Sequence, residues 1–156
     1  MAHELFAGDP APNFELPTDG GGQARLADFK GKPIVLYFYP KDDTSGCTAE
    51  AIDFNAARAK FAAVATAVVG VSPDSAASHD KFKRKHDLKI ALAADPERSA
   101  IEAYGVWKEK SMYGRKYFGV ERSTFLIDRA GKIAKVWRKV KVPGHVDEVL
   151  AAAKAL

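Results

Sequence analysis

A single cysteine, Cys47, is the residue of this chain with the greatest capacity for chemistry. Without a second cysteine it cannot form a disulfide within the chain. It is therefore either a small buried apolar residue or a reactive thiol. Only the thiolate form of a cysteine attacks as a nucleophile, so the residues around Cys47 decide between these two interpretations.

The surroundings of Cys47 favour a thiolate. Cys47 falls in the first turn of a predicted helix, where unpaired backbone N–H groups and the positive end of the helix dipole attract an anion. Thr44 can place a hydroxyl beside the sulfur, and Gly46 lets the backbone come close. A fixed cation would complete the site. The best candidate is Arg122, at the start of a predicted strand, because arginine stays charged and does not compete as a base.

These side chains need a scaffold, and its centre is the apolar run Pro33–Pro40. The run is apolar on both faces and rich in aromatic and β-branched residues, which predicts a central strand buried on two sides. Pro40 ends the strand, because proline cannot donate to a ladder. A polar loop follows, and then a helix from near Cys47 to Val64 with apolar residues close to helical spacing.

The rest of the chain alternates between strand and helix patterns. A short strand at 13–16 followed by the glycine-rich turn 18–23 indicates an N-terminal hairpin, and residues 26–32 a helical turn. Further strands are predicted at 65–72, 90–93, 123–128 and 133–137, further helices at 76–86, after Asp95-Pro96 and at 145–156, and a loop at 106–119. This order predicts an α/β, thioredoxin-like fold with a central mixed sheet flanked by helices. Cys47 then lies beyond the carboxyl end of a central strand, where sites in such sheets usually form.

Composition limits the remaining possibilities. The 156 residues fit one domain, 1–156, with apolar content of 47% and charged content of 28% that are typical of soluble globular proteins. No run approaches the roughly 18 apolar residues of a membrane span. Residues 1–6 show neither a basic nor an apolar region of a signal peptide, so a cytoplasmic location is expected. The net charge of +4 is concentrated at 81–85 and 138–141, which we interpret as a solvated helix face and an exposed strand end rather than a nucleic-acid site.

Other polar residues receive simpler interpretations. The histidines His79, His86 and His145 lack metal-ligand spacing and are expected in solvated or capping positions. Asp42 and Asp43 are expected to serve loop solubility and the charge balance at the start of the helix. We therefore expect neither a metal nor an organic cofactor.

The stretch Tyr37–Glu50 resembles the peroxiredoxin signature Pro-x-x-x-Thr-x-x-Cys. The similarity is greatest to the Q-type subgroup, also called bacterioferritin comigratory proteins, and runs from about Gly8 to the C-terminal helix. The segments Gly105–Trp107, Met112–Gly114 and Glu121–Asp128 resemble that subgroup too. The resemblance implies a thiol peroxidase, with Cys47 attacking a hydroperoxide to become a sulfenic acid.

The resemblance also implies roles for the neighbours of Cys47. Thr44 and Arg122 would bind and polarise the peroxide, and Pro40 would shield the sulfur from solvent. Glu50 would orient neighbouring groups, including Arg122. Trp107 would either line the pocket or belong to the core.

The chain departs from many Q-type members at Ile52, which occupies the position where they carry a second, resolving cysteine. An external thiol (thioredoxin, glutaredoxin or glutathione) is therefore expected to reduce the sulfenic acid, unless Cys47 pairs with Cys47 of a second chain. Both a monomer and a homodimer remain open, and overoxidation is a hazard. A redox sensor or a holdase chaperone that uses the same cysteine is the alternative function. A thioredoxin-type oxidoreductase needs Cys-x-x-Cys, and position 50 is Glu50.

Overall fold

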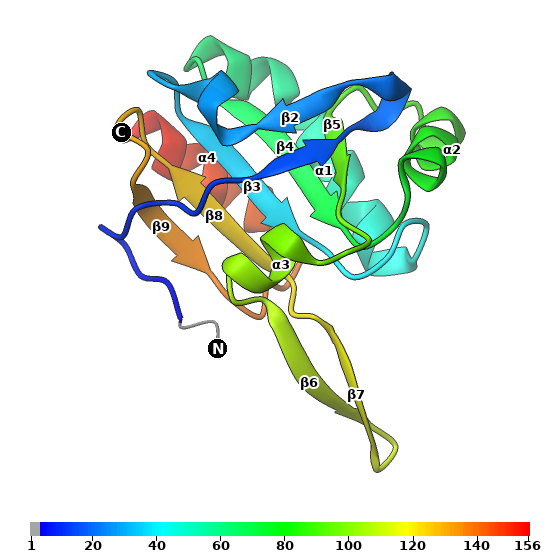
Figure 1. Ribbon diagram of the computed structural model, residues 1–156. Helices are drawn as coiled ribbons and strands as arrows, with labels where there is room; N and C mark the ends of the chain where they lie inside the picture. Colours follow the sequence, from blue (N-terminus) through cyan, green and yellow to red (C-terminus); the bar gives the residue numbers. More distant parts are fainter. Residues whose placement is uncertain (1–3) are drawn as a thin grey trace.

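A five-stranded mixed sheet forms the centre of the fold in the computed structural model, which describes residues 4–156 (Figure 1). Its strands are β3 (Ile34–Phe38), β4 (Ala67–Ser72), β5 (Ala91–Ala94), β8 (Ser123–Ile127) and β9 (Ile133–Trp137). They are ordered β5-β4-β3-β8-β9, with β3, β4 and β5 parallel and β8 antiparallel to both β3 and β9. The α/β, thioredoxin-like fold expected from the sequence is confirmed.

Both faces of this sheet are covered, which explains the continuous apolar sequence of β3. All five residues of β3 are buried. One face carries α1 (Ser45–Ala63), α2 (Ala76–His86) and α4 (His145–Lys154), while the other carries the N-terminal hairpin and α3 (Ser99–Ala103) (Figure 1). Alternate residues of β3 enter these two separate apolar clusters.

The N-terminal hairpin forms as expected. It consists of β1 (Glu15–Pro17) and β2 (Gln23–Arg25), joined through the short 3₁₀ turn Asp19–Gly21, and a second 3₁₀ turn follows at Leu26–Phe29. Several boundaries differ from the prediction by a few residues, and the structure explains two of these shifts. The strand β4 begins two residues late because Ala65 adopts a left-handed backbone after α1, with φ of 54°. The helix α3 begins at Ser99, because Asp95 first accepts hydrogen bonds from the backbone of Ser99 and Ile101.

The prediction of a loop at 106–119 is wrong. This segment is a second hairpin, β6 (Trp107–Met112) and β7 (Arg115–Val120), which projects from the body of the molecule (Figure 1). Its turn residues Tyr113 and Gly114 both have positive φ, 53° and 76°, as the tightest hairpin turns require. Most of the hairpin is exposed, so neither face carries the apolar alternation from which strands are usually recognised.

The expectation of a solvated or capping position is wrong for His79 and His145, and the expectation of loop solubility is wrong for Asp42. His79 and His145 are buried, at 0% and 4% exposure, and Asp42 is buried with His79. Only His86 fits the expectation, since it lies at the surface and pairs with Asp43. Within residues 4–156, no group of three or more acidic, histidine or cysteine side chains is placed to hold a metal. No helix in that range is long and apolar enough to cross a membrane.

The segment 1–6, on which the expectation of a cytoplasmic location partly rests, begins outside the described residues.

Candidate active site

Cys47 is the third residue of α1, the helix that follows β3 after the connecting segment 39–44. Its side chain is 1% exposed and packs in the apolar cluster beneath α1. The helix begins here because Thr44 adopts the extended backbone of an N-cap residue, and because the Thr48 amide donates to the Thr44 carbonyl at 2.8 Å. The first turn therefore presents its free N–H groups where the thiol lies.

Thr44 does not cap the helix with its side chain. Its hydroxyl instead donates to the Lys41 carbonyl at 2.9 Å. The hydroxyl proton is thus committed, and the lone pairs of the oxygen are left to accept a hydrogen bond. Thr44 is exposed, so a ligand arriving from solvent can reach this acceptor.

Arg122 reaches Cys47 from a distant part of the sequence. It immediately precedes β8, and the antiparallel pairing of Ser123 with Phe38 sets it beside the end of β3. Its Nη2 donates to Cys47 Sγ at 3.1 Å, and its Nη1 donates to Glu50 Oε1 at 2.6 Å. The guanidinium is therefore fixed by a carboxylate on one side while it faces the sulfur on the other.

Glu50 lies one turn after Cys47 on α1 and is fully buried. Burial raises the pKa of Glu50 to about 7, although Arg122 opposes this shift. Among the described residues, Glu50 Oε2 has no hydrogen-bond partner. For Arg122, burial opposes the charge, but Glu50 and Cys47 together outweigh it and raise the pKa of the guanidinium.

Gly46 leaves room for the guanidinium. A Cβ at this position would lie 3.2 Å from Arg122 Nη2. The sequence indicated a close approach of the backbone at Gly46, and the group that comes close is the side chain of Arg122. A larger residue would require the guanidinium to shift by a few tenths of an ångström.

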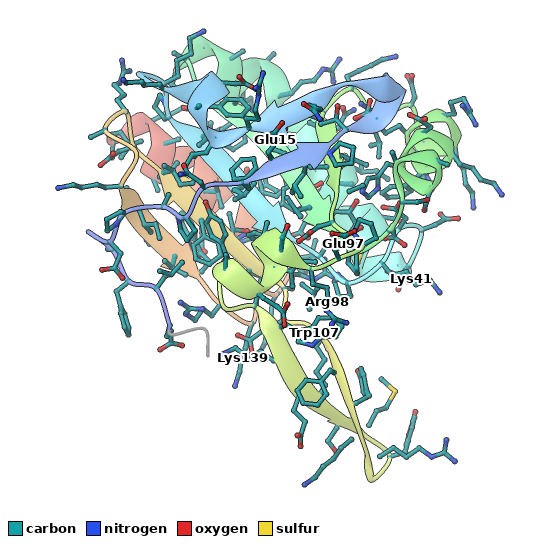
Figure 2. All side chains as sticks on the ribbon, viewed as in Figure 1. Glu15, Lys41, Glu97, Arg98, Trp107 and Lys139 are labelled. Atoms are coloured by element: carbon teal, nitrogen blue, oxygen red, sulfur yellow. The ribbon has the colours of Figure 1, made fainter. Side chains whose placement is uncertain are left out.

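Pro40 and Trp107 were also singled out in the sequence, and they lie in different parts of the fold. Pro40 is half-buried in the segment that joins β3 to α1. Trp107 starts β6, where it stacks on Phe118 with ring centroids 6.4 Å apart, and the Arg98 guanidinium lies 4.5 Å above its ring. Figure 2 shows Arg98 and Trp107 together at the base of the projecting hairpin. Trp107 packs against the apolar cluster on the sheet face opposite Cys47, which favours the core interpretation.

Sequence reasoning missed a buried polar cluster beside the Cys47 loop. Asp42 Oδ1 accepts from the Tyr39 hydroxyl at 2.6 Å, and Oδ2 accepts from the Ser78 hydroxyl at 2.8 Å. The Nδ1 of His79 lies 2.7 Å from Asp42 Oδ2, and its Nε2 lies 3.0 Å from the Ala93 carbonyl. Both ring nitrogens of His79 and both oxygens of Asp42 therefore have hydrogen-bond partners within the cluster.

The same cluster sets the charge of Asp42. Burial alone would raise the pKa of Asp42, but the hydrogen bonds from His79 and Tyr39 outweigh it and hold this pKa below its ordinary value. One signal could have revealed the cluster. His79 and Phe82 are three residues apart and form the buried side of the otherwise polar helix α2.

A buried thiol at the start of a helix, facing an arginine that a carboxylate fixes, defines a thiol-based redox enzyme on a thioredoxin-like sheet. Comparison with known proteins gives the family. Residues 7–136 match the AhpC/TSA family. Peroxiredoxin Bcp of Bacillus subtilis is 52% identical over 147 residues, which is 94% of each chain.

Solved structures agree. A cysteine variant of peroxiredoxin Q from Xanthomonas campestris superposes with a TM-score of 0.90 at 44% identity, over 97% of this chain and 99% of that one. A PrxQ variant from Xylella fastidiosa gives 0.92 at 40% identity, over 99% and 98%. The chain belongs to the AhpC/TSA family, and it is a peroxiredoxin, a thiol-dependent peroxidase. The resemblance noted in the sequence is confirmed.

Proposed function

We propose that this protein reduces hydroperoxides by a one-cysteine mechanism, in which Cys47 attacks the peroxide and an external thiol completes the cycle. The observation that carries the proposal is the hydrogen bond from Arg122 Nη2 to Cys47 Sγ at 3.1 Å. A guanidinium at this distance stabilises a thiolate and stands where the oxygens of a bound peroxide develop negative charge.

The first step is a displacement at oxygen. The Cys47 thiolate gives an electron pair to the terminal oxygen of the hydroperoxide, so that an S–O bond forms and the O–O bond breaks. The terminal oxygen keeps its proton and becomes part of the sulfenic acid. The other oxygen leaves as an alkoxide or hydroxide and takes up a proton to become an alcohol or water.

Each neighbour has a role in this step. Arg122 donates to the sulfur and to the departing oxygen, while Thr44 accepts the hydrogen bond of the peroxide O–H with the lone pairs that its own bond to Lys41 leaves available. Glu50 holds the guanidinium in place through its 2.6 Å hydrogen bond. Pro40, half-buried in the segment before α1, would shield the sulfur from solvent.

The second half of the cycle needs a thiol from outside, because the chain has one cysteine. Ile52 is 44% exposed on α1 and offers no thiol. The external thiol condenses with the sulfenic acid, which forms a mixed disulfide and releases water. A second thiol then attacks this disulfide and frees Cys47. Thioredoxin, glutaredoxin and glutathione are the candidate reductants.

The remaining proposals concern substrate, assembly and location. A structure of the Xanthomonas campestris bacterioferritin comigratory protein, 42% identical, was described for its alkyl peroxide reduction activity, which supports organic hydroperoxides beside hydrogen peroxide. Cys47, Arg122, Glu50 and Thr44 come from one chain, so the site needs no second copy, and the protein acts as a monomer or as a homodimer of independent sites. Dependence on a thiol reductant fits a reducing compartment, the cytoplasm.

The decisive experiment compares peroxide consumption by the wild type and by Cys47→Ser with excess dithiothreitol as an artificial resolving thiol. We expect turnover by the wild type and none by the variant, with mass spectrometry showing a mixed disulfide on Cys47 when glutathione replaces dithiothreitol. Equal activities would remove Cys47 from the mechanism. A wild type that forms the sulfenic acid but does not turn over would favour the redox sensor or holdase instead.

A further inference from the structure

The hairpin β6–β7 exposes an unusual share of large apolar side chains. Seven such side chains are exposed on the described part of the chain, and four belong to this hairpin: Met112, Tyr113, Tyr117 and Phe118. Tyr113 at the tip is 98% exposed. Figure 2 shows the side chains of the hairpin spreading to both sides of a ribbon that stands apart from the body of the molecule. Exposed aromatic residues and methionine are typical of surfaces that bind another protein.

The strand register divides the hairpin into two faces. Lys110 pairs with Tyr117, and Met112 pairs with Arg115, so these side chains share a face. We call it the Lys110 face, and its members are Lys108, Lys110, Met112, Arg115 and Tyr117. It combines three cations with two apolar side chains and contains no acidic residue.

The opposite face has a different character. Its members are Trp107, Glu109, Ser111, Lys116, Phe118 and Val120. Trp107 ties the base of this face to Arg98, and Lys116 is 3.7 Å from Glu109. The charges on this face are therefore balanced, and part of its apolar surface is already covered.

The Lys110 face adjoins the active site. The Lys110 side chain extends over Gly119, where its Cδ and Cε lie 3.7 Å from the position of a Cβ, three residues before Arg122. Burial and the charge of Arg122 lower the pKa of Lys110, while Cys47 and Glu121 oppose this shift. The chain also runs from the end of β7 through Glu121 directly into Arg122. A protein bound to the Lys110 face would thus lie near Arg122, whose guanidinium contacts the sulfur.

We propose that the Lys110 face is the docking surface for a protein reductant, a small dithiol protein whose reactive thiol is surrounded by apolar surface and acidic residues. The proposal rests on the proposed function, since only a one-cysteine cycle requires such a partner. Cys47 is 1% exposed, so a partner must be held closely before its thiol can reach the sulfur. The three cations would steer an acidic partner, and Met112 and Tyr117 would supply the apolar contact.

A second copy of this chain is a poorer occupant. A two-fold interface places the same patch against itself. Two Lys110 faces would then bring six cations together with no acidic residue to balance them, which is unfavourable.

The hairpin provides matched variants for a test, because neighbouring residues of the same kind lie on opposite faces. Arg115→Glu and Tyr117→Ser alter the Lys110 face, while Lys116→Glu and Phe118→Ser make the same changes on the other face. Steady-state peroxide reduction is measured with two reductants: a bacterial thioredoxin regenerated by its reductase and NADPH, and dithiothreitol. Glutaredoxin regenerated by glutathione serves as a second protein reductant.

We expect Arg115→Glu and Tyr117→Ser each to lower kcat/KM for the protein reductant about tenfold, the change produced by roughly 1.4 kcal/mol of lost binding. Their activity with dithiothreitol should stay within about twofold of the wild type. Lys116→Glu and Phe118→Ser should stay within about twofold of the wild type with either reductant. The wild-type rate with the protein reductant should also fall as salt is added.

Equal losses on both faces, losses that extend to dithiothreitol, or turnover with dithiothreitol but with neither protein reductant would each overturn the docking proposal. A wild type that is inactive even with dithiothreitol would instead refute the proposed peroxidase mechanism.

Discussion

Two buried ionic clusters flank the loop between β3 and α1, and they differ in how completely their polar atoms are satisfied. In the cluster of Asp42 and His79, every polar side-chain atom of the pair has a partner. In the cluster of Arg122 and Glu50, one carboxylate oxygen has no partner within residues 4–156, and the guanidinium holds a sulfur whose chemical state changes during the reaction.

This difference separates a structural role from a catalytic one. A saturated buried cluster has one favourable arrangement and therefore fixes the chain around it. An unsaturated cluster keeps hydrogen-bonding capacity for a substrate, at a cost in folding stability. Changes in the first cluster should therefore act mainly on stability, and changes in the second mainly on rate.

The largest expected effect is on stability, from His79→Leu. The variant leaves the buried Asp42 carboxylate without its histidine partner, and breaking one partner of a buried pair costs about 3–5 kcal/mol. Urea unfolding measures the loss. The matched control is His86→Leu, which removes the surface pair with Asp43 and should change stability little. If the two variants lose the same stability, the buried cluster does not have the structural role assigned to it.

Arg122→Gln should lower the rate of peroxide reduction more than it lowers stability. Loss of a preorganised donor to developing charge lowers a rate about 10²–10³-fold. Stability should change less than in His79→Leu, because burial favours the neutral form of Glu50 once the cation is gone. Peroxide kinetics with dithiothreitol and urea unfolding give the two readouts. Arg122→Lys keeps the charge but loses the second donor group, so its rate should lie between those of the wild type and Arg122→Gln. Full activity of either variant would contradict the catalytic role of Arg122.

The sequence predicted the unsaturated cluster better than the saturated one. Cys47, Thr44 and Arg122 belong to short motifs whose chemistry is readable from residue types, and the apolar run of β3 placed them at the end of a central strand. Asp42 and His79 carry no such motif. Their burial follows from α2 packing against β5 and the loop, because the Ala93 carbonyl and the Asp42 carboxylate meet the ring only after folding.

The hairpin at 107–120 escaped prediction for a related reason. A strand pattern is recognised when one face is buried, and here most residues are exposed. The turn residues Tyr113 and Gly114 were a usable local signal, but tyrosine is uncommon at positive φ.

The titration of Glu50 should make the stability of the folded protein depend on pH, which tests whether its cluster is unsaturated. Its pKa is about 7 in the folded protein because of burial, against 4.5 for an ordinary glutamate. Between these values the folded state binds a proton that the unfolded state releases. The contribution of this group to stability is therefore complete below pH 4.5 and is lost as the pH rises through about 7, a change on the order of 3 kcal/mol.

Urea midpoints between pH 5 and pH 8 measure this dependence. Glu50→Gln has no titrating group, so its stability should vary less with pH than that of the wild type. Glu15→Gln changes an exposed glutamate on β1 and should keep the wild-type slope. An unchanged slope in Glu50→Gln would show that Glu50 is ionised throughout this range, as in the saturated cluster.

The smallest expected effect comes from removing one hydroxyl group, either that of Tyr39 or that of Tyr37. Tyr37 and Tyr39 lie on the same side of the chain and stack with centroids 5.6 Å apart. The Tyr39 hydroxyl donates to Asp42, whereas the Tyr37 hydroxyl is buried without a partner among the described residues. Removing a hydroxyl that leaves a buried acceptor short of a donor costs about 1–3 kcal/mol, whereas removing an unpartnered hydroxyl releases its desolvation cost.

Tyr39→Phe should therefore lower the free energy of unfolding by about 1–3 kcal/mol, and Tyr37→Phe should leave it unchanged or raise it. Both rings keep their stacking, so Phe54, which packs 4.5 Å from Tyr37, is undisturbed. Urea unfolding of the two variants at one pH gives the comparison directly. Destabilisation by Tyr37→Phe would mean that a bound water joins the Tyr37 hydroxyl to the protein, and the site beneath Cys47 would then be as saturated as the cluster around His79.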